Sequence, residues 1–260
     1  MKISELISEL KSWASVHVDE SRTCDTVKAG NAENEIKKVA VSMFATPDVV
    51  RAAGEWGANF LIVHEPTYYN HMDREYDHEL AYRKKEFIEK SGMTIFRFHD
   101  YAHAMSPDLI CEGNLKYLGL KGEFKKGSNF AINNFLLEND MTALELAALI
   151  EEKIGIKNVR IAGDINTKGR RISCCFGTPG HLEDEIKTND FVLAGEICEW
   201  FFGEMARDYS QLGESKAAIV MGHIGSERSG MKLLAEKLGE KHPEFETKYF
   251  ECGEVYQYTK

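Results

Sequence analysis

A strand, a helix and a second strand follow one another within residues 35–63, and this unit restricts the possible folds more than any other feature of the chain. Apolar residues recur through 35–41 and occupy 60–63 of the segment 59–63 (NFLIV), as expected of two strands. Between them, Thr46, Pro47 and Asp48 are typical of a helix start: an N-cap hydroxyl, a proline in the first turn and a carboxylate at the positive end of the helix dipole. Two strands joined by one helix should be parallel and adjacent. The sequence therefore predicts an α/β fold built on parallel strands.

The composition is that of an ordinary globular chain, and it argues against several classes of function. The 260 residues suffice for one large domain or two modest ones. The formal net charge of -10 argues against a large nucleic-acid footprint and against an anionic membrane surface, because both favour clustered positive charge. Apolar runs such as 60–63 are strand-sized, so we expect no membrane span. The N-terminus lacks the apolar stretch of a secretory signal, and the six cysteines show no CxxC spacing. We therefore expect reduced thiols and a cytoplasmic protein.

The order of predicted elements changes along the chain, which indicates two domains. Strands and helices alternate up to about residue 121, with a third strand expected over 93–98. Beyond residue 122, shorter strands are expected over 128–138, 159–161, 172–176 and 191–194. The last part is expected to hold a strand over 217–221, a helix over 227–241 and a strand over 248–258. We predict a discontinuous metal-binding α/β domain, residues 1–121 with 216–260, and a second α/β domain over residues 122–215.

Imidazole and carboxylate side chains follow the ends of three predicted strands. They are His64, Glu65, His99, His103, His223 and Glu227. In an open α/β sheet, ligands gather at the carboxyl ends of the strands, so the three groups could converge on one point. Nitrogen and oxygen ligands without thiolate suit catalytic zinc, manganese or iron(II), and their number exceeds what one tetrahedral ion needs. Two ions bridged by a carboxylate, with water between them as the nucleophile, are the natural interpretation. Any one of these residues, taken alone, is more often a surface or hydrogen-bonded side chain.

Five motifs occur in order along nearly the whole chain. They are residues 61–66 (LIVHEP), 99–103 (HDYAH), 176–180 (FGTPG), 194–196 (AGE) and 222–227 (GHIGSE). These segments resemble, in turn, the strand-HHP motif, the HTNLD motif, the Gly-rich turn, the TGE or TGD motif and the GHxxxE motif of the Nif-three-like dinuclear metal proteins. Members of that family are often called GTP cyclohydrolase I type 2.

The resemblance implies a two-domain α/β protein with two divalent metal ions per chain, zinc, manganese or iron, in the cleft between the domains. It also implies a ring-shaped homohexamer. Carried over position by position, the ligands would be His64, Glu65, His103, His223 and Glu227. Glu65 stands where the family has the second His of HHP, and His103 stands where it has the Asp of HTNLD. This exchange would preserve a set of three imidazoles and two carboxylates.

We first expect a metal-dependent hydrolase that acts on a nucleotide-like or other small substrate, with His99 or Glu196 as the proton-transfer group. A GTP cyclohydrolase-like ring opening is only one option among the possible reactions, because family membership does not fix the reaction. The alternatives are a non-enzymatic metal-binding scaffold or regulatory protein, and an α/β protein with scattered histidines. The histidine pair that often follows Gly-Glu in the family is replaced here. Trp200 in that stretch would stack on a flat ring or be buried at a packing contact.

Overall fold

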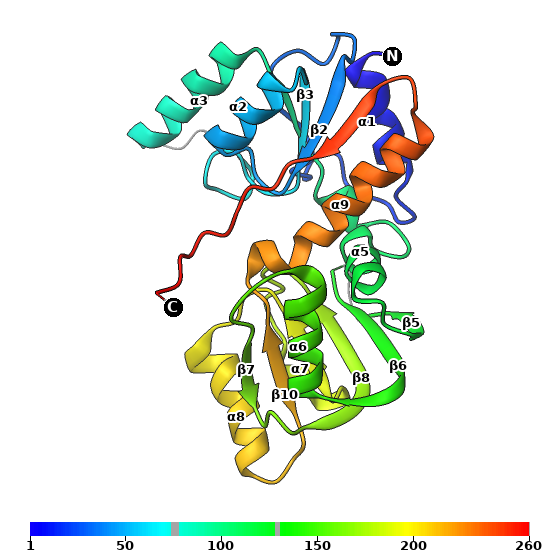
Figure 1. The fold of residues 1–260 in the computed structure, drawn as a ribbon, viewed down its shortest axis with the longest axis vertical. Helices are drawn as coiled ribbons and strands as arrows, with labels where there is room; N and C mark the ends of the chain where they lie inside the picture. The colour runs from blue at the N-terminus through cyan, green and yellow to red at the C-terminus, as the bar shows by residue number, and fades with distance from the viewer. Residues whose placement is uncertain (74–77, 128–130, 260) are drawn as a thin grey trace. The chain divides into compact units, whose positions relative to one another are not determined.

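The computed structural model describes residues 1–73, 78–127 and 131–259, and the chain divides into two compact units (Figure 1). Unit 1 comprises Met1–Leu109 and Met231–Lys260, and unit 2 comprises Ile110–Gly230. The first unit is thus discontinuous, but its boundaries differ from the predicted 1–121 and 216–260. The main reason is β10 (Ala217–Val220), which we had assigned to the metal-binding domain. It is hydrogen bonded in the sheet of unit 2, so that assignment is wrong.

The sheet of unit 1 has the strand order β1-β4-β3-β2-β11. Its strands are β1 (Val27–Ala29), β2 (Lys38–Ser42), β3 (Phe60–Val63), β4 (Thr94–Arg97) and β11 (Glu246–Tyr249). The strands from β4 to β11 in this order pair in parallel, whereas β1 is antiparallel to β4. Pairing of β2 with β3, from Val39 opposite Phe60 to Ser42 opposite Val63, confirms the predicted strand-helix-strand unit.

Helices cover both faces of this sheet (Figure 1). They are α1 (Ile3–Ser12), α2 (Pro47–Glu55), α3 (Glu79–Ser91), the short α4 (Asp100–His103) and the C-terminal part of α9 (His223–Lys241), while α5 (Leu109–Leu118) begins at the unit boundary. The predicted start of α2 is confirmed, because Thr46 Oγ1 accepts a hydrogen bond from Val49 N at 3.2 Å. Buried side chains of α2 and α3, such as Val50 and Ile88, pack on Leu61 of β3. Each such side chain contributes about 1.5–3 kcal/mol when it is fully buried.

The sheet of unit 2 has the strand order β5-β6-β8-β9-β10-β7. Its remaining strands are β5 (Gly122–Lys126), β6 (Asn133–Thr142), β7 (Arg160–Gly163), β8 (Lys168–Cys175) and β9 (Phe191–Ala194). The central strands β8, β9 and β10 are parallel, and β5, β6 and β7 join the sheet antiparallel. Its helices are α6 (Ala143–Ile154), α7 (Glu183–Thr188), the π-helix η1 (Glu199–Gly203) and α8 (Glu204–Gln211). A capping box formed by Thr142 and Glu145 starts α6, in agreement with the spacing of these residues in the sequence.

Two predicted strands have different limits in the structure. The strand expected over 128–138 begins at Asn133, and residues 128–130 of that expectation lie outside the described residues. The C-terminal strand expected over 248–258 covers only Glu246–Tyr249, so the prediction for 250–258 is wrong. The tail beyond β11 exposes Val255 and Tyr256 and so lacks the buried face that stabilises a strand.

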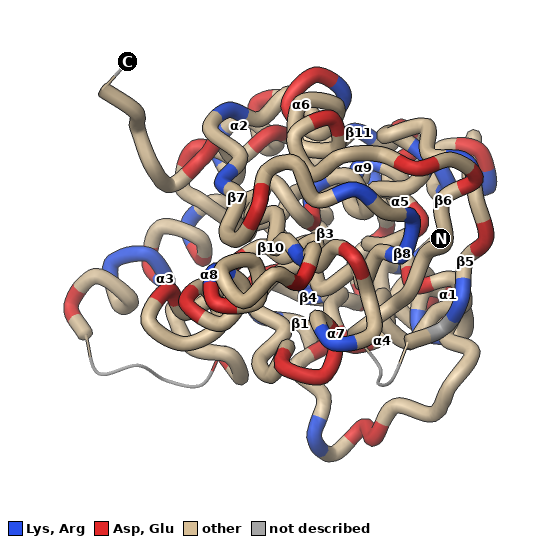
Figure 2. The backbone as a smooth tube through the Cα atoms, turned by 90° about the horizontal axis from the view of Figure 1, so that it is seen from below, with Lys and Arg blue, Asp and Glu red and all other residues tan. Residues whose placement is uncertain are grey.

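Charged residues of both signs occur along the chain, and no disulfide is present among the described residues. Lys and Arg positions are interspersed with Asp and Glu along the backbone (Figure 2). All six cysteines are free thiols, and four of them are buried. Among the described residues, no helix combines the length and the apolar character that a membrane crossing requires.

Candidate metal centre

The carboxyl ends of β3 and β4 bring three histidines of unit 1 together. The two strands are parallel neighbours, with Val63 opposite Arg97, so the residues that follow them emerge at the same edge of the sheet. His64 follows β3, and His99 lies two residues after the end of β4. The short helix α4 then places His103 one turn beyond His99, with His103 N donating to His99 O at 3.1 Å.

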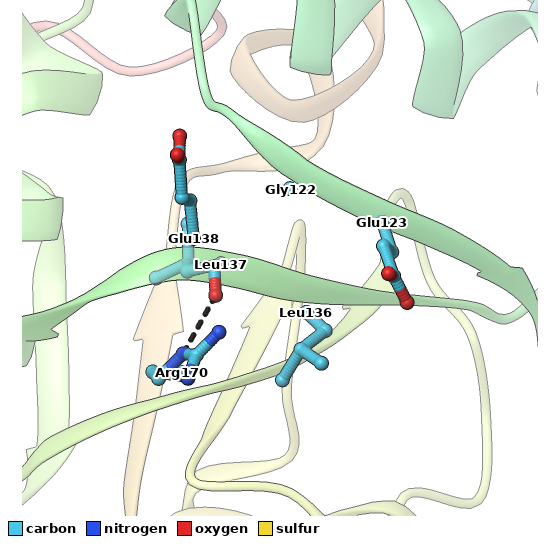
Figure 3. Close-up of a pocket in the computed structure, with 6 residues that line it drawn as sticks. All are labelled: Gly122, Glu123, Leu136, Leu137, Glu138 and Arg170. Carbon is cyan, nitrogen blue, oxygen red and sulfur yellow. Dashed lines mark hydrogen bonds between the residues drawn. The ribbon is translucent and has the colours of Figure 1, made fainter.

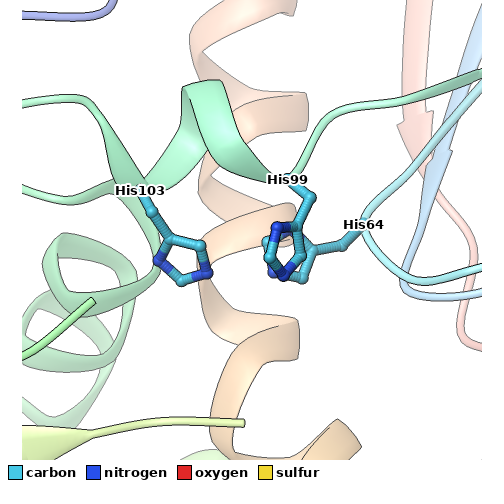
Figure 4. Close-up of side chains that lie close together, drawn as sticks. All are labelled: His64, His99 and His103. Atoms are coloured by element: carbon cyan, nitrogen blue, oxygen red, sulfur yellow. The ribbon is translucent and has the colours of Figure 1, made fainter. Parts of the chain in front are cut away.

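The three imidazole rings form one compact cluster (Figure 4). The ring centroids lie 4.6 Å apart for His64 and His99, 5.0 Å for His99 and His103, and 5.2 Å for His64 and His103. One ring nitrogen from each residue lies within 4.8 Å of the other two, which is close enough for a single metal ion to be held by all three. A carboxylate oxygen of Glu65 also lies within 4.8 Å of a ring nitrogen of His64.

Each of these imidazoles is oriented through its Nδ1 atom. His64 Nδ1 lies 3.0 Å from the carbonyl oxygen of Phe98. Because a carbonyl oxygen can only accept, Nδ1 must carry the proton and Nε2 the lone pair that a metal ion requires. His99 Nδ1 is 2.8 Å from Asp100 Oδ1, and His103 Nδ1 is 2.7 Å from Asp108 Oδ2. Carboxylates in this position select the same tautomer and increase the basicity of the ligand nitrogen.

Burial keeps His99 neutral at physiological pH. It lowers the pKa of the His99 imidazole to about 4, although the hydrogen bond to Asp100 acts in the opposite direction. The pKa of Asp100 is lowered below its ordinary value by its hydrogen bonds to His99 and Thr23, against the effect of burial. The pair is therefore a neutral imidazole beside an ionised carboxylate.

Asp25 fixes the start of α4 and was not predicted from the sequence. Its carboxylate accepts hydrogen bonds from the backbone N–H groups of His99, Asp100 and Tyr101 at 2.9–3.0 Å. Ligand atoms of Cys24, Asp25, His99 and Asp100 also lie within 4.8 Å of one another. Since the Asp25 oxygens are engaged by backbone donors and burial raises the pKa of the Cys24 thiol, we assign this second group a structural role.

The carboxyl ends of three parallel strands form the corresponding site of unit 2. Residues Cys175 of β8, Ala194 of β9 and Val220 of β10 lie side by side in the register. Gly177, Glu196 and His223 follow these strand ends, and the three connections are linked by backbone hydrogen bonds. Glu196 N donates to Gly177 O at 2.8 Å, and Gly222 N donates to Gly195 O at 3.0 Å.

His223 and Glu227 share one face of α9, which begins at His223 and not at residue 227 as expected. His223 Nε2 lies 3.2 Å from Glu227 Oε2, and Glu227 is buried. The other ring nitrogen, Nδ1, lies 2.7 Å from Glu196 Oε1 and 3.2 Å from Thr178 Oγ1. Glu196 therefore orients His223 from the neighbouring strand, in the same way that Asp108 orients His103.

Gly177 explains why a glycine-rich turn lies beside these residues. Its φ of +66° is unfavourable for other residues, and a Cβ atom placed there would lie 2.3 Å from Glu227 Oε1 and 3.4 Å from His223 Nε2. The turn thus allows close packing against the carboxylate. Gly195 packs similarly, since a Cβ there would lie 2.4 Å from Gly177 O.

The sequence model of Duf34/NIF3 (NGG1p interacting factor 3) matches residues 1–254. This chain belongs to the NIF3 family. It is 24% identical to the GTP cyclohydrolase 1 type 2 homolog of Clostridium perfringens over 253 residues, which cover 93% of this chain and 92% of that protein. The homolog of the same name from Campylobacter jejuni is 24% identical over 243 residues, which cover 92% of each chain.

Solved structures of NIF3-like proteins have the same two-domain fold. The protein ybgI, described as of unknown function, superposes with a TM-score of 0.79 at 19% identity, over 98% of this chain and 100% of that chain. Reduced HcgD from Methanocaldococcus jannaschii superposes with a TM-score of 0.72 at 17% identity, over 96% of this chain and 97% of that chain. The predicted fold class and the family resemblance are confirmed.

The predicted residues of this NIF3-family chain occur in both units. Within unit 1 the structure brings together His64, Glu65, His99 and His103, and within unit 2 it brings together Glu196, His223 and Glu227. The strands that precede them belong to two sheets, so the assignment of the strand before His223 to the metal-binding domain is wrong. It failed because β10 pairs with β9 and β7, a long-range choice that no local pattern encodes.

Two other features of unit 2 bear on the search for a binding site. Trp200 is 80% exposed on η1, so it is not buried by its own chain. A pocket of about 340 Å³ opens over β5 and β6, where Arg170 Nε donates to Leu137 O at 2.7 Å (Figure 3). Arg170 lies near the start of β8 and Gly177 follows its end, so this pocket is not at the strand ends that carry His223.

Proposed function

We propose that this NIF3-family chain is a metal-dependent hydrolase with a dinuclear centre. The proposed ligands are His64, Glu65, His103, His223 and Glu227, with Glu227 as the bridging carboxylate. The observation that carries the proposal is the compact group of imidazoles in unit 1, each held through Nδ1 so that Nε2 has the lone pair of a ligand. The pair of His223 and Glu227 supplies the same donor chemistry in unit 2. Nitrogen and oxygen donors of this kind suit zinc, manganese or iron.

When bound, a pair of divalent ions would supply an activated water at neutral pH. The chain's own residues would orient the ligands and transfer the proton. We propose His99 as the proton-transfer group, because Asp100 fixes its proton on Nδ1 and leaves Nε2 as the basic atom. Glu196 was the second candidate for that role. Its hydrogen bond to His223 favours an orienting function instead.

The substrate is proposed from the names of the relatives, and the assembly from the resemblance of the sequence motifs. Their name, GTP cyclohydrolase 1 type 2 homolog, suggests a small nucleotide-like substrate, and ring opening of GTP is one reaction to test. A ring-shaped homohexamer and a cytoplasmic location complete the proposal. The free thiols support a reducing compartment.

Metal content and turnover, measured on the same samples, test the proposal. We expect about two ions per chain by mass spectrometry, and metal-dependent hydrolysis in a panel of nucleotides and esters that includes GTP. Changing His64 to Ala should lower both. Changing His181, whose side chain is 93% exposed, to Ala should alter neither and serves as the matched control. Metal binding without turnover of any substrate would favour the scaffold or regulatory alternative. Wild-type protein that binds no metal would refute the centre itself.

The proposed role of Glu227 has its own test. If Glu227 bridges two ions, then Glu227→Gln should reduce the metal content to one ion or none. Full occupancy in this variant would show that Glu227 is not the bridge.

A further inference from the structure

Arg97 is the only fully buried arginine among the described residues, and it lies beside the proposed centre. Its side chain is 0% exposed at the end of β4, two residues before His99. A guanidinium remains charged at any physiological pH, and its burial is costly unless acceptors and opposite charges surround it. The groups around Arg97 therefore indicate what it does.

Arg97 contacts both ends of the segment that follows β3. Its Nε donates to His64 O at 2.9 Å, and its Nη1 donates to His71 O. Its Nη2 lies 3.6 Å from Glu65 Oε2, and its Nη1 lies 4.0 Å from Asp73 Oδ2. One side chain thus holds the backbone of a proposed metal ligand and the carboxylate of the next residue.

Asp73, the second carboxylate near Arg97, interacts with two lysines as well. Lys28 Nζ lies 3.4 Å from Asp73 Oδ2, and the charge of Asp73 also acts on the buried Lys84. These lysines compensate the charge of Asp73, so Arg97 can serve as a counter-charge of Glu65. The Glu65 side chain is only 8% exposed, so water screens this pair weakly.

Glu65 lies close to both Arg97 and His64. One carboxylate oxygen is within 4.8 Å of a ring nitrogen of His64, while Oε2 is near the guanidinium. We propose that Arg97 is a positioning residue for the metal centre: it holds the Glu65 carboxylate and cancels its charge, so that Glu65 acts as a charge-compensated ligand. This inference rests on the metal centre of the proposed function. It adds a dependence of metal binding on a residue that contacts no metal.

Charge compensation predicts that Arg97 and Glu65 are coupled. Removing the cation alone leaves a buried carboxylate without its counter-charge. Replacing Glu65 by a neutral imidazole alone leaves a buried cation next to the metal. Changing both restores the balance, so the two effects on metal affinity should not add.

The experiment measures Zn²⁺ affinity and stoichiometry, together with the visible spectrum of the Co²⁺-loaded protein. The variants are Arg97→Met, Glu65→His and the double variant, with Lys28→Met as the matched control that removes a nearby buried cation. We expect Arg97→Met to bind Zn²⁺ about 10–100-fold more weakly, the range typical of residues that support metal ligands. We expect Glu65→His to be weakened as well, the double variant to bind more tightly than Glu65→His, and Lys28→Met to bind like wild type.

The outcomes separate this inference from the proposed function. If wild-type protein binds no metal, the proposed centre fails and the inference fails with it. If wild-type protein binds metal and Arg97→Met binds it equally well with an unchanged Co²⁺ spectrum, only the role of Arg97 is refuted. If Arg97→Met does not fold, the Zn²⁺ affinity of Glu65→His is compared with that of the double variant or of Glu65→His/Arg97→Gln. This comparison then tests the inference. Equal or weaker binding when Arg97 is also replaced would overturn the inference.

Discussion

Replacing Gly177 by alanine tests how closely the turn after β8 supports Glu227. The new Cβ would lie 2.3 Å from Glu227 Oε1, whereas ordinary contacts begin at 3.4 Å, so the carboxylate must move by about 1 Å (3.4 - 2.3 = 1.1). A positive φ adds a backbone cost of about 1–2 kcal/mol for a residue with a side chain. Crowding in a packed site adds about 1–3 kcal/mol. We expect a total loss of roughly 2–5 kcal/mol in the free energy of unfolding.

Gly180→Ala is the matched control for this substitution. Gly180 lies in the same turn at a φ of +80°, and nothing is within 4 Å of its Cβ position. The Gly180→Ala variant should therefore lose only the stability that the positive φ costs, and it should keep its metal affinity. Urea unfolding gives the stability of both variants, and calorimetric titration with Zn²⁺ gives the affinity, which should fall about 10–100-fold in Gly177→Ala alone. Equal Zn²⁺ affinity in the two variants would refute the argument that Gly177 is required by the position of Glu227.

Other consequences concern the histidines, the pH and the metal itself. Asp108→Asn should weaken Zn²⁺ binding about tenfold in titration, because the amide orients His103 less strongly. The free energy of unfolding of the metal-free protein, measured with urea, should decrease as the pH falls from about 6.5 to about 4. His99 in the unfolded chain binds a proton at a higher pH than the buried His99 of the folded chain does. The loss approaches about 3 kcal/mol and should be absent in His99→Gln. Chelation should lower the Tm, because metal binds only the folded state. Light scattering should give the mass of six chains, and a monomer at micromolar concentration would contradict the proposed ring.

Local signals in the sequence were sufficient where one short segment determines the structure. Thr46 caps α2, the capping box at Thr142 starts α6, and the four-residue spacing of His223 and Glu227 places both on one helix face. The order of motifs identified the family. These features depend on neighbours along the chain, which a single sequence displays.

Features that depend on distant segments were missed or misplaced. Asp25 caps α4 from 74 residues away, and no local pattern connects the two. The position of β10 was misassigned because its apolar residues would suit either sheet. Arg97 falls inside the strand expected over 93–98, and only its buried surroundings in the structure show that it lies near Glu65.

The acceptors that orient the histidines show how the sheets organise the site. His64 is held by the carbonyl of Phe98, which follows the adjacent strand, and His223 is held by Glu196, which also follows an adjacent strand. A parallel sheet brings both members of each pair to the same edge, so the ligand and its orienting group are positioned by the same backbone hydrogen bonds. Substitutions in β4 or β9 that shift the strand should therefore impair metal binding without touching any ligand. This dependence explains why the donor set can be rigid although most of its members lie in connections between elements.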